Sequence, residues 1–269
     1  MALGLTIIFG LLDVINMAHG ECYALGAYLA VSLLAAGVSF WVCLAAVPLV
    51  AAAVGYAAER SLIQRVFHSR DRHTLTLLLT FGVAIIAEDV FKLIYGPNPY
   101  RPESPISGVA DLFGIILPNY RVFLIAAGAA IIAAVWVVVY RTSLGAMVRA
   151  AAFDKAMAAS LGVPVQRVYA GTFAFGVALA ALSGVLLAPV YSVFPTMGKD
   201  FILLAFSVVI VGGMGSIKGA VIAGLVLTQI QSISSLYISP VWSDPLVFGI
   251  MVLFLMLRPQ GLAGRLGHG

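Results

Sequence analysis

Charge is scarce in this chain of 269 residues. Asp, Glu, Lys and Arg make up only 10% of it, whereas about 25% is usual in a soluble domain. Hydrophobic residues account for 62%, and the mean hydropathy is +1.08. This composition excludes an ordinary soluble domain and predicts a polytopic membrane protein. The net charge of +4 does not indicate a nucleic acid partner, because basic residues of membrane proteins usually flank spans on the cytoplasmic side.

Cysteines and catalytic groupings are also few. Cys22 and Cys43 lie in apolar stretches without metal-like spacing, which predicts buried free thiols and no disulfide. The sequence shows no evident Ser-His-Asp set, metal-ligand cluster or pair of catalytic carboxylates. We therefore expect a protein that is not an enzyme and that holds no metal and no cofactor of its own.

The segment GGMGSIKG, residues 212–219, could be mistaken for a phosphate-binding loop. A Walker A loop reads G-x-x-x-x-G-K-[ST] between a strand and a helix, whereas here Lys218 precedes Gly219 between two apolar runs. ATP binding is therefore expected on another polypeptide. No long polar linker or low-complexity run divides the chain, which predicts a single membrane domain over residues 1–269.

Nine apolar runs predict an all-α fold with about eight or nine transmembrane or partly re-entrant helices. A helix needs about 20 residues to cross a hydrocarbon layer of ~30 Å, and most of the runs are long enough. The run 201–213 is short, so we expect it to be tilted, broken or extended through its glycines. The nine runs are 2–15, 22–38, 40–58, 75–94, 122–140, 169–194, 201–213, 220–238 and 241–257.

Basic residues concentrate on alternate loops, which predicts the orientation. The segments 59–73 and 141–168 are basic and should be cytoplasmic, whereas 95–120 should be an ordered external loop. Continuing the alternation places the C-terminus in the cytoplasm and 11 of the 15 Lys and Arg residues on the inner side. These 11 are Arg60, Arg65, Arg70, Arg72, Arg141, Arg149, Lys155, Arg167, Lys218, Arg258 and Arg265.

The longest inner loop, 141–168, carries the signals of a surface helix. Thr142 or Ser143 can cap it, residues 144–161 are good helix formers, and Gly162 and Pro164 are stop signals. Such a helix, with Arg149, Asp154 and Lys155 exposed, has little core to bury by itself and is expected to dock into a partner. The alternative is a helix that lies at the membrane interface for structural reasons alone.

Four separated motifs carry a resemblance to a known family. They are GLTIIFGLLDVINMAHGECYALGAY, GAMVRAAAFDKAMAASLGVPVQRV, VVIVGGMGSIKGAVIAGLVL and LRPQGLAGR, and together they span nearly the whole chain. In this order they resemble the permease subunit of branched-chain amino acid ABC importers, the high-affinity hydrophobic amino acid uptake family of bacteria.

The resemblance implies a function and a set of partners. In that family the permease pairs with a second, related permease, two cytoplasmic ATP-binding subunits drive the cycle, and a periplasmic binding protein delivers the substrate. It implies a multi-pass protein of the bacterial inner membrane that takes up branched-chain or other hydrophobic amino acids, with ATP used by the partner subunits. It also makes residues 141–168 the cytoplasmic coupling segment, with Gly162 at the glycine of the ABC permease loop motif.

Polar residues within the first motif are the candidates for the translocation path. Asn16, His19 and Glu21 can persist at membrane depth by bonding across helices, by facing a cavity or by capping a broken helix. Glycine-interrupted stretches in both halves of a transporter indicate a midplane site. The residues expected there are Asn16, His19, Gly20 and Glu21 in the first half, and Gly212, Gly213 and Gly215 in the second.

The sequence also permits other roles for the polar trio and other functions for the chain. The polar trio could be structural residues of a helix break near the inner surface, with His19 and Glu21 solvated. The chain could move urea or short amides, because relatives with those substrates share the architecture. It could also be an autonomous secondary transporter or channel that uses Asp13, Glu21 or Glu88 for proton coupling. The basic inner loop favours the ABC permease, since an autonomous carrier needs no ATPase dock.

Overall fold

The computed structural model describes residues 1–66, 71–112, 115–237 and 239–263. Helices dominate it, which confirms the all-α prediction, and the one hairpin of the described residues joins two short strands. The elements are α1 (Ala2–Leu12), α2 (His19–Ala35), α3 (Phe40–Ala58), η1 (Glu59–Ile63), α4 (Gln64–Val66), α5 (Arg72–Tyr95), β1 (Val109–Leu112), β2 (Ile115–Pro118), α6 (Asn119–Arg141), α7 (Ser143–Phe153), α8 (Lys155–Ser160), α9 (Val165–Leu187), α10 (Met197–Gly212), α11 (Ile217–Tyr237) and α12 (Pro240–Leu257). Arg70 and Arg265, assigned above to the inner side, lie outside the described residues.

Each of the nine apolar runs coincides with a helix. Four helical segments of the described chain are long and apolar enough to cross a membrane by themselves: 40–66, α6, α9 and α11. The short run 201–213 becomes α10, which starts earlier, at Met197, and reaches 16 residues. At ~1.5 Å per residue this helix is about 24 Å long, so it falls short of the ~30 Å hydrocarbon layer.

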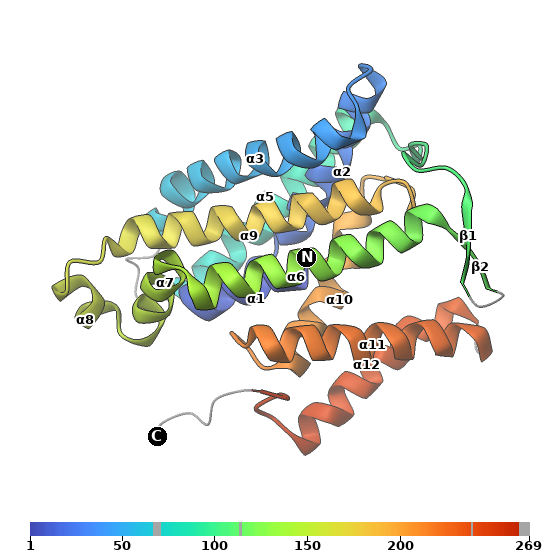
Figure 1. The fold of residues 1–269 in the computed structure, drawn as a ribbon. Helices are drawn as coiled ribbons and strands as arrows, with labels where there is room; N and C mark the ends of the chain where they lie inside the picture. Colours follow the sequence, from blue (N-terminus) through green and yellow to red (C-terminus); the bar gives the residue numbers. More distant parts are fainter. Residues whose placement is uncertain (67–70, 113–114, 238, 264–269) are drawn as a thin grey trace.

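Helix α9 forms the centre of the bundle, with α3 on one side and α6 on the other (Figure 1). It also packs against α1 and α2. Of its most apolar stretch of 18 residues 67% is buried, whereas only 11% of the corresponding stretch of α6 is buried. Small residues permit the close approach, as in other membrane helix pairs. A Cβ on Gly26 of α2 would overlap the Ala181 backbone, and one on Gly184 would overlap the Tyr23 carbonyl oxygen.

The two longest connections lie at opposite ends of the bundle. Figure 1 shows α7 and α8 at one end and the β1–β2 hairpin at the other. In the hairpin Val109 pairs with Pro118, and Tyr100 forms an isolated bridge to Val193 in the loop before α10. This arrangement agrees with the expectation that segments 141–168 and 95–120 face opposite sides of the membrane.

The inner loop differs from its prediction in one respect. The single helix expected over 144–161 is wrong, because the chain breaks at Asp154 into α7 and α8. The Asp154 backbone is extended, and its carboxylate accepts hydrogen bonds from the Ala156 and Met157 amides at 2.8 and 2.9 Å. Asp154 thus acts as the N-cap of α8, a role for which aspartate is favoured. Thr142 caps α7 by accepting from the Gly145 amide at 3.1 Å.

Candidate functional site

The polar trio of the first motif lies at the break between α1 and α2. The interruption spans residues 13–18 and contains no glycine, while Gly20 lies within continuous α2. Asp13 takes the left-handed conformation (φ 52°), which Asp tolerates better than most residues. Asn16, His19 and Glu21 are all buried, and this argues against the alternative in which His19 and Glu21 are solvated.

Helix α5 supports the α1–α2 break. The Thr80 hydroxyl accepts a hydrogen bond from the Met17 amide at 3.2 Å and donates to the Ile15 carbonyl oxygen at 3.3 Å. The Asp13 carboxylate lies 3.7 Å from the Arg72 guanidinium and 3.5 Å from the His73 ring. These contacts fix the irregular backbone to a neighbouring span, since it cannot satisfy its own polar groups as a helix does.

Several side-chain atoms of the trio keep unused hydrogen-bonding capacity. Within the described part of the chain, both amide atoms of Asn16, Nδ1 of His19 and Oε2 of Glu21 are buried and have no hydrogen-bond partner. The other His19 nitrogen, Nε2, lies 3.3 Å from the Met1 carbonyl oxygen. Buried polar groups are normally satisfied by protein or by ordered water, so these atoms are exceptions among the buried groups of the described chain.

Asn16 and Glu21 line a cavity of about 330 Å³; we call these two residues the cavity polar pair. The cavity lies between α2, α3, α5 and α9, and its remaining walls are almost entirely apolar. Cys22 also lines it and is only partly buried, whereas Cys43 is fully buried; both are free thiols, as predicted. The surface of the cavity is almost wholly apolar, because the amide atoms of Asn16 and Oε2 of Glu21 are buried away from it.

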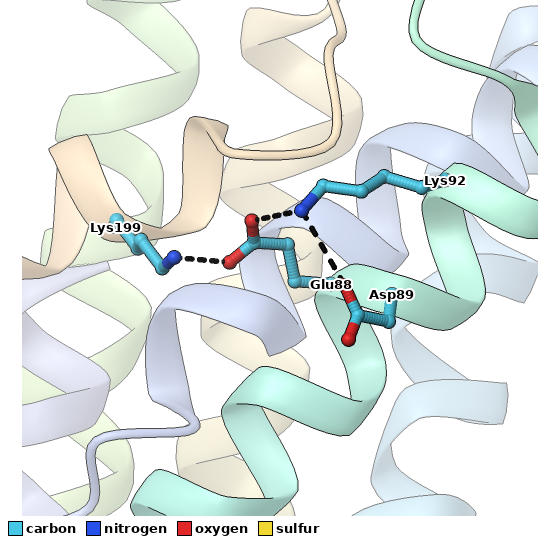
Figure 2. Close-up of polar contacts among 4 residues, drawn as sticks. All are labelled: Glu88, Asp89, Lys92 and Lys199. Carbon is cyan, nitrogen blue, oxygen red and sulfur yellow. Dashed lines mark hydrogen bonds and ion pairs between the residues drawn. The ribbon is translucent and has the colours of Figure 1, made fainter.

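An ion-pair cluster around buried Glu88 joins α5 to α10, and its lysines are partly exposed. Glu88 is buried, and its two carboxylate oxygens lie 2.6 Å from Lys92 Nζ and 2.5 Å from Lys199 Nζ (Figure 2). Lys92 also lies 3.4 Å from Asp89, three residues before it on the same face of α5. The interaction with Lys199 was missed, because that residue is far away in the sequence.

The start of α10 is fitted closely against α2. A Cβ on Gly20 would overlap the Gly198 carbonyl oxygen, and a Cβ on Gly198 would lie 2.6 Å from the carboxyl carbon of Glu21. The Glu21 carboxylate therefore lies over the first turn of α10, at Gly198, which is the residue before Lys199. The charges of Glu88, Lys199 and Lys92 all act on Glu21. Helices α2, α5 and α10 thus bring four charged residues together.

The glycines of the second half do not join this group. Gly215 lines a different cavity, of about 930 Å³, together with Gly10 and Arg149. Gly212 packs against Gly219, and Gly213 packs against Gly261. The structure therefore separates the expected path residues into two places, with the cavity polar pair at one and Gly215 at the other.

The expected coupling residues largely hold the inner loop in shape. Arg149 donates a hydrogen bond to the Val139 carbonyl oxygen and lies over the Tyr140 ring. Asp154 caps α8, and Lys155 lies over the Tyr169 ring. Gly162 takes a left-handed conformation (φ 83°) where the loop turns into α9.

Apolar side chains project from this loop instead, and sequence reasoning missed them. Phe153, Met157 and Leu161 are exposed by 80%, 59% and 76%, and we call them the loop apolar triad. Their spacing of four residues was the signal that could have revealed them. Glu59, at the π-helical turn η1, was also missed: it is buried, and among the described residues its Oε2 has no hydrogen-bond partner.

Comparisons with known proteins extend over nearly the whole chain. A family profile described as "Branched-chain amino acid transport system / permease component" matches residues 1–256. The chain is 32% identical to the high-affinity branched-chain amino acid transport system permease protein LivH of Salmonella typhimurium, over 98% of this chain and 90% of LivH. The corresponding protein BraD of Pseudomonas aeruginosa is 29% identical, over 98% of this chain and 91% of BraD.

A more distant relative is a differently named permease protein. LivM of Escherichia coli is 27% identical over 97% of this chain and 66% of LivM. No solved structure matches the chain. The relatives and the apolar helices together identify a multi-pass membrane protein. The chain belongs to the family of permease components of branched-chain amino acid transport systems.

Proposed function

We propose that this chain is a permease subunit of an ABC importer in the bacterial inner membrane. It pairs with a second, related permease to form the path for branched-chain or other hydrophobic amino acids. Two cytoplasmic ATP-binding subunits drive the cycle, and a periplasmic binding protein delivers the substrate. The relatives named LivH, BraD and LivM support the amino acid substrate and the second permease. The chain itself has no catalytic role and needs no cofactor, and its C-terminus is cytoplasmic.

The observation that carries this proposal is the loop apolar triad. Segment 141–168 is the basic connection assigned to the cytoplasm, where water would surround large apolar side chains. Exposed Phe, Met and Leu side chains at intervals of four residues, on a loop assigned to the cytoplasm, favour an interaction site there. The short helices α7 and α8, held by the Thr142 and Asp154 caps, present the triad to the ATP-binding subunit.

A matched pair of variants tests this docking. Phe153→Glu places a charge in the proposed contact, and we expect it to lower ATP-driven leucine uptake and retention of the ATP-binding subunit at least about tenfold, as truncating a central contact does. Gln166→Glu adds the same charge at an exposed position on the next helix and should leave both unchanged. Equal behaviour of the two variants would remove the docking assignment.

The whole function is tested by uptake of labelled leucine into proteoliposomes. The vesicles hold this chain with its second permease and ATP-binding subunits, and internal ATP and the binding protein are omitted in turn. Uptake that requires both supports the importer. Uptake by this chain alone, driven by a proton gradient, would instead establish an autonomous transporter. Uptake of urea or short amides, without uptake of leucine, would replace amino acids as the substrate class assigned to this chain.

A further inference from the structure

The cavity of about 330 Å³ offers almost no polar surface to an occupant. Its walls come from α2, α3 with η1, α5 and α9, whose apolar runs lie at membrane depth. The polar atoms of Asn16 and Glu21 are buried away from it, and the Glu21 carboxylate lies against Gly198 of α10 instead. A water molecule in a protein cavity needs about two to four polar partners. The space is therefore unsuited to water or to a polar solute, and an apolar occupant fits it.

The cavity is elongated along α5. Leu79 and Phe91 both line it and are about 12 residues apart, so the cavity extends on the order of 18 Å along the helix axis. Half of a hydrocarbon layer of ~30 Å is about 15 Å thick. The length of the cavity therefore matches that of an acyl chain in one leaflet.

The cavity opens to the side of the bundle between α3 and α5. Val54 and Leu62 of the helical segment 40–66 line it, as do Ile86 and Val90 of α5, and all four side chains are also exposed at the surface. Helix α3 packs mainly on α9 and α2, and α5 packs mainly on α2, so α3 and α5 do not pack tightly against each other in the described chain. An acyl chain of the surrounding bilayer can enter sideways through this opening.

Basic side chains lie at the inner end of the cavity. Arg65 follows Leu62 by three residues on the segment 40–66, so the two lie on neighbouring turns of one face. Arg72 precedes Leu79 by two turns on α5, where it is partly exposed beside Asp13. Arg65 is exposed. Basic pockets between membrane helices on the cytoplasmic side bind anionic lipid headgroups, so the charge here complements a phospholipid phosphate.

We propose that this cavity holds one acyl chain of an anionic phospholipid from the inner leaflet. The chain lies along α5 between Leu79 and Phe91, and the headgroup phosphate accepts hydrogen bonds from the Arg65 guanidinium at the membrane surface. The lipid fills a space that the side chains leave open and joins α5 to α3 and α9. This inference uses the cytoplasmic assignment of segment 59–73, and it is independent of the transported substrate.

Lipid retained by the purified transporter tests the site. The complete transporter is reconstituted with equal amounts of phosphatidylglycerol and phosphatidylcholine that carry the same acyl chains, extracted into detergent and analysed by native mass spectrometry. We expect phosphatidylglycerol to be retained about fivefold in preference to phosphatidylcholine, the effect of one basic residue near the membrane surface. Phosphatidylglycerol with a photoreactive diazirine in one acyl chain should label peptides from residues 79–91.

Two pairs of variants locate the lipid. Val83→Trp places a large side chain in the cavity and should abolish the retention and the labelling, whereas Leu93→Trp alters an exposed residue of the same helix outside the lining and should preserve both. Arg65→Gln should remove the preference of about fivefold for phosphatidylglycerol. Arg141→Gln makes the same chemical change at the inner end of α6, which does not line the cavity, and should keep the preference.

Several results would overturn the lipid site. A wild-type transporter that retains no phospholipid and shows no label on α5 would mean that the cavity stays empty or is covered by the second permease. Equal retention by Val83→Trp and Leu93→Trp would place the lipid elsewhere. If Val83→Trp does not assemble, Arg65→Gln decides, and an unchanged preference in that variant would contradict the proposed headgroup contact. Uptake is not measured in these experiments, so a failure of the lipid site leaves the proposed importer intact.

Discussion

The two halves of the chain interrupt their helices by different means. Between α1 and α2 the break is polar: Asp13 takes a left-handed conformation, and Thr80 of α5 hydrogen-bonds the irregular backbone. Between α10 and α11 the break is made of glycine: Gly213 and Gly215 have positive φ, and Gly212 and Gly215 lie against Gly219 and Gly10. The first break places Asn16 in the lining of the 330 Å³ cavity, whereas at the second break the backbones of Gly212 and Gly219 meet and Gly215 lines the 930 Å³ cavity.

This difference indicates separate roles for two motifs that look alike in the sequence. A break held by side chains can keep polar groups available for a ligand at membrane depth. A break packed backbone against backbone allows two helices to cross at close distance. The C-terminal segment strengthens the second break, because the Leu262 and Ala263 amides donate to the Val211 and Gly212 carbonyl oxygens at 2.8 and 3.2 Å.

The largest expected effect comes from breaking the glycine contact. A Cβ on Gly219 would overlap the Gly212 carbonyl oxygen, so Gly219→Ala should destabilise the protein by about 3 kcal/mol, the upper part of the range for overpacking. The measurement is the midpoint of thermal unfolding in detergent. On the same helix, a Cβ on Gly224 would lie 3.5 Å from Val208 Cγ1, an ordinary contact. Gly224→Ala should therefore not destabilise, and equal losses in both variants would contradict the close crossing.

An intermediate effect should separate transport from stability at the polar break. Asn16→Leu replaces a buried amide that has no hydrogen-bond partner in the described chain. The midpoint of thermal unfolding should therefore be unchanged or higher. Leucine uptake should nevertheless fall about tenfold, because Asn16 is an expected residue of the translocation path and the polar amide is lost from it.

Ser32 of α2, the helix that follows the polar break, provides the control for Asn16. Its hydroxyl lies 2.7 Å from the Tyr95 hydroxyl, so Ser32→Ala should cost about 1 kcal/mol of stability while uptake continues. If Asn16→Leu lowers stability and spares uptake, the two breaks do not differ in the way proposed.

The smallest effect concerns the backbone of the polar break. Because Asp13 is left-handed, Asp13→Ala should be about 1 kcal/mol less stable than Asp13→Gly. Loss of the contacts with Arg72 and His73 is common to both variants and contributes little, since these side chains are largely exposed. Unfolding midpoints of the two variants test this ordering. Identical midpoints would mean that the backbone at residue 13 relaxes when the side chain is removed.

The sequence predicted what depends on local pattern. Apolar runs gave the helices, Thr142 was among the caps expected for α7, and Gly162 marked the end of the loop helix. The break at Asp154 was missed although its signal is local, because Asp154 lies within good helix formers and its role as an N-cap competes with continuing the helix.

Features that depend on distant residues could not be predicted. Glu88 and Lys199 lie on different helices, and no local spacing connects them. The cavity needs α2, α3, α5 and α9 in place before Asn16 and Glu21 belong to one lining. The sequence could identify these two residues as unusual, because polar groups at membrane depth need a reason. It could not show that Gly215 lines another cavity.

The central position of α9 has a consequence for how the protein is made. Helices α1, α2 and α3 are synthesised first, yet all three pack against a helix that starts at Val165. At a synthesis rate of about 5–20 residues per second, on the order of ten seconds pass between the synthesis of α3 and the synthesis of α9. During that interval their small-residue faces meet lipid or other proteins, so the bundle assembles only after its helices are inserted. Membrane insertase and quality-control factors would meet this protein first as separate helices.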